Sequence, residues 1–87
     1  MQIAEINEPV KVRADFLPGG RVVPLAFKRT TQEVFTVSRV NSSWEDTEPE
    51  HRLLYFSVTT DKSDDAYQLR YQDEDRTWWL ECVMMEG

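Results

Sequence analysis

Residues 53–60 read Leu-Leu-Tyr-Phe-Ser-Val-Thr-Thr, and this stretch decides the fold. Aliphatic, aromatic and β-branched residues dominate it, which is typical of a β-strand. Its first residues are apolar at every position, so neither face of the strand is suited to water. We therefore predict a central strand over residues 53–60, with other strands on both of its sides.

The other apolar residues recur with the two-residue period of strands, in which successive side chains point to opposite faces. Four further runs show this alternation: residues 10–16, 23–27, 67–71 and 78–84, the last with Trp78, Leu80, Cys82 and Met84 on one face. Residues 33–40 are rich in β-branched side chains, and a break in their phase predicts a bulge near Ser38-Arg39.

Turn residues separate these runs. Leu17-Pro18-Gly19-Gly20 places Pro where φ is preset and Gly where φ is positive, which predicts a hairpin turn. Pro24 cannot donate to a strand ladder, so its strand is predicted to lie at an edge or to carry a bulge. The polar residues 41–50, which include Trp44 and Pro49, are predicted to form the longest loop.

This pattern predicts an all-β fold. We expect a single domain over residues 1–87, an antiparallel meander of about six strands curled into a half-open or closed barrel. Residues 1–8 fit either an edge strand or a helical turn. A chain of 87 residues buries only about 60–65% of its unfolded surface, so nearly every large apolar residue is needed in the core.

The composition excludes several classes of protein. One Cys and one His exclude an internal disulfide and the Cys₂His₂ and Cys₄ zinc sites, and we expect no metal and no cofactor. No apolar run approaches the ~18 residues of a membrane helix, and no signal peptide is evident, so we expect a cytoplasmic protein. The net charge of −6 argues against a protein dedicated to coating DNA or RNA.

No catalytic constellation is evident, and we predict that the chain is not an enzyme. Nucleophilic catalysis needs a base beside the nucleophile, but His51 follows an acidic run while Cys82 belongs to an apolar alternation. Glu81 lies on a strand, and we predict a cross-strand pair with Arg70.

The aromatic residues offer the best candidate for a binding surface. Trp78 and Trp79 are adjacent on a strand and must point to opposite faces, so Trp79 shares a face with Glu81. There it is either a stacking platform or protein-binding anchor, or a structural residue packed under an arginine or another segment. The candidate binding residues are Trp44, Trp79, Arg70, Arg39 and Arg13.

Three functional hypotheses follow. The first is a non-catalytic protein-interaction or self-association module that uses the aromatic face and an edge strand near Pro24 or at residues 1–8. The alternative is a single-stranded nucleic-acid-binding accessory protein, with Lys11, Arg13, Arg39 and Arg70 following the backbone. The third is a regulator or enzyme with a small ligand in the barrel mouth.

Several landmarks recur in a fixed order. They are Asn7-Glu8-Pro9-Val10-Lys11-Val12, then Trp44, then Tyr55 to Thr60, then Tyr67 to Tyr71, an acidic turn, and Trp78 to Val83. This order resembles a small uncharacterised bacterial domain family, some of whose members are encoded near lesion-bypass polymerases. The resemblance implies no established activity, and the acidic balance of this sequence departs from the family.

Overall fold

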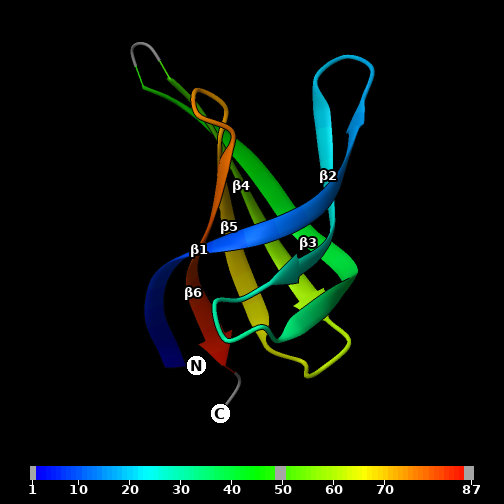
Figure 1. Cartoon of the computed structure of the whole chain (residues 1–87), viewed down its shortest axis with the longest axis vertical. Helices are drawn as coiled ribbons and strands as arrows, with labels where there is room; N and C mark the ends of the chain where they lie inside the picture. The colour runs from blue at the N-terminus through cyan, green and yellow to red at the C-terminus, as the bar shows by residue number, and fades with distance from the viewer. Residues whose placement is uncertain (1, 49–50, 86–87) are drawn as a thin grey trace.

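The computed structural model describes residues 2–48 and 51–85 as six antiparallel strands. They are β1 (Gln2–Leu17), β2 (Arg21–Lys28), β3 (Val34–Glu48), β4 (His51–Thr60), β5 (Ala66–Gln72) and β6 (Thr77–Met85). Each strand pairs with the next, and β1 also pairs with β6, so the sheet closes into a ring (Figure 1). The predicted all-β meander is confirmed. The described residues include no helix that is long and apolar enough to cross a membrane.

Two strands are shared between the two walls of the ring. β1 pairs with β6 over residues 2–10 and with β2 over residues 11–17. β3 pairs with β2 only over residues 34–36 and with β4 from Val37 onward. The larger wall therefore contains β4, β5, β6 and long parts of β1 and β3, whereas the smaller wall is centred on β2.

Bulges bend the strands that pass from one wall to the other. The register of β3 against β4 skips Ser38 and Asn41, which confirms the bulge predicted near Ser38-Arg39. The register of β2 against β1 skips Leu25, next to Pro24. Of the two alternatives predicted for the Pro24 strand, the bulge is confirmed. β2 is not an edge strand as a whole, because it pairs with both β1 and β3, although its residues 21–25 have no β3 partner.

A further bulge shifts the alternation of β6. Glu81 is the extra residue, because its neighbours Leu80 and Cys82 pair with adjacent residues of β5. Val83, rather than Cys82, is therefore buried together with Leu80. The prediction that Cys82 and Met84 continue the core face of β6 is wrong for this reason, and both are half-buried.

The predicted loop over residues 41–50 is wrong for the residues that the structure describes. Residues 41–48 are the second part of β3 and pair with β4 as far as His51, while Pro49 and Glu50 lie outside the described residues. This hairpin extends beyond the core at the top of Figure 1, and residues 41–47 are exposed. Its polar sequence reflects contact with water and not a lack of strand structure.

The N-terminal ambiguity is also resolved. Residues 2–8 are strand, and β6 occupies one of their edges from the pair of Gln2 with Met85 onward. Met1 lies outside the described residues. At the other end of β1, the alternation over residues 10–16 predicts that Phe16 faces the core with Val12. Phe16 is instead 61% exposed, with its ring centre 5.8 Å from that of Tyr71.

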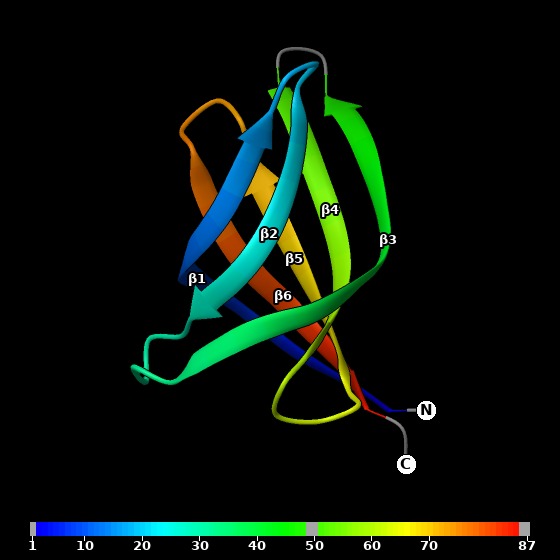
Figure 2. The ribbon, with the colours of Figure 1, turned by 90° about the vertical axis from the view of Figure 1, so that its right-hand side faces the viewer.

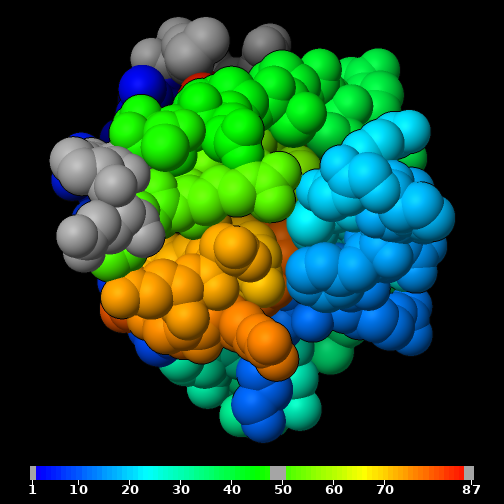
Figure 3. Space-filling model, turned by 90° about the horizontal axis from the view of Figure 1, so that it is seen from above, coloured from blue at the N-terminus to red at the C-terminus, as the bar shows by residue number. Residues whose placement is uncertain are grey.

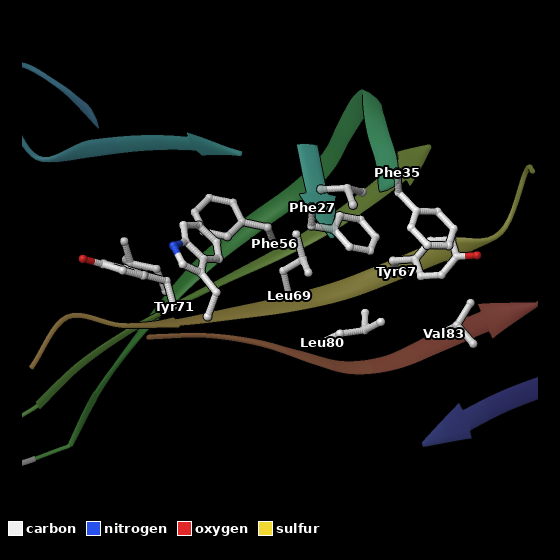
Figure 4. Packing of buried hydrophobic residues seen from close by; sticks show 11 residues of the cluster. Phe27, Phe35, Phe56, Tyr67, Leu69, Tyr71, Leu80 and Val83 are labelled. Atoms are coloured by element: carbon white, nitrogen blue, oxygen red, sulfur yellow. The ribbon is translucent and has the colours of Figure 1, made fainter. Parts of the chain in front are cut away.

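The core fills the ring from end to end (Figure 4). Phe27 stacks on Phe35 with ring centres 4.9 Å apart, and Tyr67 packs 5.3 Å from Phe35. At the opposite end, Tyr71 lies 4.8 Å from Trp78. The predicted central position of β4 is confirmed, because β4 pairs with β3 on one side and with β5 on the other. The buried residues of these two strands are Leu54, Phe56, Val58, Tyr67, Leu69 and Tyr71.

Glu8 ties β1 to the turn between β2 and β3. Its carboxylate accepts hydrogen bonds from the Arg29 guanidinium at 2.6 Å and from the backbone N–H and the hydroxyl of Thr30 at 3.2 and 3.1 Å. The Glu8 side chain is only 17% exposed. These bonds, chiefly that of Arg29, lower the pKa of Glu8 from 4.5 to about 2.

This pKa makes the stability of the fold depend on pH. Because the pKa of Glu8 is lower in the folded state, its stabilisation is complete above about pH 5 and is lost as the pH falls toward 2. A shift of this size corresponds to about 3 kcal/mol. We expect Glu8→Gln to destabilise the protein at pH 7 by about 2–3 kcal/mol and to remove this part of the acid sensitivity, as measured by urea unfolding followed through Trp fluorescence.

The matched control is Glu5→Gln, because Glu5 is exposed on the same strand. It should leave the free energy of unfolding within about 0.5 kcal/mol of the wild type. Equal unfolding energies for Glu8→Gln and the wild type at pH 7 would contradict the role given to Glu8.

Candidate functional site

One residue from each strand of the larger wall falls in a single transverse row on its outer face. The alternating neighbours Leu54, Leu69 and Leu80 are buried, so the row points outward. In the pairing of neighbouring strands, each member of this row lies opposite the next, in the order Trp44, Tyr55, Arg70, Trp79 and Pro9. We call this set the outer row.

Aromatic and cation–π contacts organise the outer row. Trp44 stacks on Tyr55 with ring centres 5.4 Å apart and ring planes 6° apart. The Arg70 guanidinium lies 5.5 Å from the centre of the Trp79 ring. Arg70 also pairs with Glu81 at 2.6 Å, which confirms the predicted cross-strand pair. Trp79 is half-buried and Trp44 is 44% exposed, so Trp44 is the more accessible indole.

The structure brings together only part of the predicted binding set. Trp44, Arg70 and Trp79 belong to the outer row. Arg39 lies on the same wall further back along β3, where its Nε donates to Asn41 Oδ1 at 2.8 Å. Arg13 lies in the part of β1 that pairs with β2, outside the row. The cations proposed to follow a nucleic-acid backbone therefore do not form one continuous line.

Beside the outer row, only a short ladder of three residue pairs closes the ring between β2 and β3. Their ladder ends at the pair of Ala26 with Thr36, and beyond it the two strands diverge (Figure 2). Viewed from above, the β1–β2 hairpin and β3 lie on either side of a hollow (Figure 3). This groove of about 370 Å³ is lined by residues 20–23 of β2 and its turn, by Val40 and residues 43–45 of β3, and by Arg52, Leu54 and Phe56 of β4.

Both banks of the groove are strand edges. Within the described residues, no ladder joins residues 21–25 of β2 to β3, and β3 pairs only with β4 beyond Thr36. The β2 edge contains Pro24, which has no N–H, so the β3 edge offers the more regular set of backbone donors and acceptors. This edge is hidden in the sequence because residues 41–48 are mostly polar, and Trp44 is the one residue among them that points to a strand.

One end of the groove is cationic. The Arg52 guanidinium pairs with the Glu45 carboxylate on β3, and Arg52 Nη2 donates to the Gly20 carbonyl oxygen at 3.4 Å across the opening. The hydrogen bond to Glu45 raises the pKa of Arg52. Arg21 also lines this end and is exposed. Among the described residues, Arg21 makes no ion pair with an acid.

The two residues with nucleophile or base chemistry lie far apart. His51 begins β4 with its Nδ1 2.8 Å from Glu74 Oε2. Cys82 lies at the level of Ser57, about 20 Å further along β4. Burial raises the pKa of the Cys82 thiol, and the charges of Glu81 and Glu5 raise it further. Over residues 2–48 and 51–85, no three His, Cys, Asp or Glu side chains are grouped to hold a metal ion.

Comparisons with protein-family models, curated proteins and solved structures give no match to this chain. The resemblance to a bacterial domain family therefore stays a prediction.

The exposure of Trp44 predicts a small cost when its ring is removed. Trp44→Ala should lower the free energy of unfolding by about 0.5–1.5 kcal/mol, because the loss is mainly the stack on Tyr55. Phe56 follows Tyr55 in β4 and is buried, so Phe56→Ala should lower the free energy of unfolding by about 3–5 kcal/mol. Urea unfolding followed by far-UV circular dichroism measures both. A cost for Trp44→Ala as large as that for Phe56→Ala would assign the Trp44 ring to the fold.

Proposed function

We propose that the chain is a non-catalytic protein-interaction module that binds an extended segment of a partner by strand addition. The observation that carries this proposal is the unpaired edge of β3 along an open groove. An incoming strand would complete the backbone hydrogen bonds of residues 41–48, as edge strands do when they accept a peptide. Main-chain pairing gives such complexes much of their affinity.

The two faces of the new strand would meet different surroundings. Its side chains alternate between the two faces of the sheet. One set would enter the groove above Leu54 and Phe56, and the other would lie on the outer face beside Trp44. Trp, Tyr and Arg are the residue types that most often dominate binding energy at interfaces, so Trp44 is the expected anchor.

The charge distribution favours a protein partner over nucleic acid. Arg70 is ion-paired with Glu81, and Arg13 lies outside the outer row. The net charge of −6 adds a repulsion that phosphate contacts would have to overcome. A second copy of this chain is a candidate source of the added strand. We place this activity in the cytoplasm, where the free Cys82 would stay reduced.

A peptide-display experiment tests the proposal. A library of random twelve-residue peptides is selected against the wild type, and selected peptides are titrated by fluorescence anisotropy. Val23 lines the groove, and Val23→Lys places a charged chain there, so we expect at least a tenfold loss of affinity. The same substitution at Val34, which is 50% exposed and outside the groove, is the matched control and should change affinity by less than twofold.

The variants are first compared by thermal unfolding, since only folded variants report on binding. If Val23→Lys does not fold, Trp44→Ala takes its place. Selected peptides that bind equally to wild type and groove variant would contradict the proposal. Binding of a labelled oligodeoxythymidine with a steep salt dependence would also contradict it, and would favour the nucleic-acid alternative.

A further inference from the structure

The groove differs along its length in a way that restricts the occupant. Its middle is apolar, with Val22, Val23 and Val40 along the sides. Its end at the β1–β2 turn carries the guanidinium groups of Arg21 and Arg52. An extended segment that fits this surface needs apolar side chains over the middle and an anionic group at the arginine end.

The contacts that hold Arg52 in place are weak enough to be exchanged. Its hydrogen bond to the Gly20 carbonyl is long, at 3.4 Å, and both partners of its ion pair with Glu45 are more than two-fifths exposed. Exposed ion pairs contribute little net stability because water and salt screen them. A strand entering the groove can therefore displace the Gly20 contact, leaving the Arg52 guanidinium with hydrogen-bond donors for a new acceptor.

Arg21 needs no such exchange. Its side chain is exposed at the start of β2, opposite Leu17 in the register with β1. The charged residues that line the groove are the cations Arg21 and Arg52 and the anion Glu45, so the lining itself has a net positive charge in a chain whose net charge is −6. Charge complementarity therefore points to a carboxylate, which a guanidinium binds with two parallel hydrogen bonds.

We propose that the partner segment bound in the groove carries an Asp or Glu side chain that meets Arg21 and Arg52. This inference rests on the proposed function, because it names the chemistry of the segment that the β3 edge receives. The acid belongs to a side chain and not to a chain end, because the β3 edge continues beyond Glu45 to the pair of Glu48 with His51. A segment that stopped at the arginines would leave those last backbone groups unpaired.

The test uses the full-length protein and the peptides selected from the random library. Among peptides whose binding is lost in Val23→Lys, we expect Asp or Glu to be enriched at one position. Replacing that residue by Asn or Gln in a synthetic peptide should weaken binding to the wild type about tenfold. With the double variant Arg21→Gln/Arg52→Gln, the same replacement should have less than a threefold effect, since both partners of the carboxylate are then missing.

Arg13→Gln is the matched control, because Arg13 is exposed on the same hairpin but does not line the groove. It should leave both the affinity and the effect of the peptide replacement unchanged. Each peptide is also made with a free and with an amidated C-terminus. If only the peptides with an amidated C-terminus lose affinity, the anionic group is the chain end, and the assignment of the acid to a side chain is overturned.

The outcomes separate the two proposals. This inference is overturned if the peptides whose binding is lost in Val23→Lys show no enrichment of Asp or Glu. It is also overturned if replacing the acid by Asn or Gln leaves the affinity unchanged. Neither result contradicts strand addition. A lack of any peptide sensitive to Val23→Lys overturns strand addition itself.

Discussion

The division of β1 between two neighbours is the constraint on which the rest of the structure depends. Residues 2–10 complete the larger wall beside β6, and residues 11–17 begin the smaller wall beside β2. A small sheet must bury one face, and β1 achieves this by passing from one wall to the other. Glu8 sits close to this passage and ties it to Arg29 and Thr30, which fixes the turn between β2 and β3 against β1.

The open groove follows from the same requirement at β3. This strand also serves both walls, but it leaves β2 after Thr36 and follows β4 through the bulges at Ser38 and Asn41. The separation leaves backbone edges without a ladder, and the buried side chains of Leu54 and Phe56 form part of the lining of the groove. An unpaired edge of this length favours association with another chain. In the proposed binding role, this unpaired edge would be the surface that receives the partner strand.

The sequence is enough to predict a strand where its hydrophobic pattern continues without interruption along the whole strand. Tyr67, Leu69 and Tyr71 in β5 alternate strictly with polar residues, and all three are buried. The apolar run of β4 predicts a central strand, and β4 pairs with a strand on each side. Prediction failed where the period changed locally. The extra residue at Glu81 is invisible in a hydrophobic pattern, yet it moves Cys82 out of the core position and Val83 into it.

The candidate site was only partly predictable for a related reason. Trp79 was assigned to the outer face because it adjoins Trp78, and the Arg70–Glu81 pair followed from strand pairing. The alignment of Trp44 with Tyr55 depends on the β3–β4 register, which cannot be read from the polar residues 41–48. The groove depends on where a ladder ends, and that is set by tertiary geometry and not by any residue type.

The central claim is that the β3 edge is unpaired in the free protein, and nuclear magnetic resonance tests it most directly. In a uniformly ¹⁵N,¹³C-labelled sample, cross-strand nuclear Overhauser effects should connect Ala26 with Thr36 and residues 42–47 with β4. We expect no such effects between residues 21–24 of β2 and the part of β3 beyond Val37. Backbone cross-strand effects between these two segments would show a closed ladder and would rule out a free β3 edge.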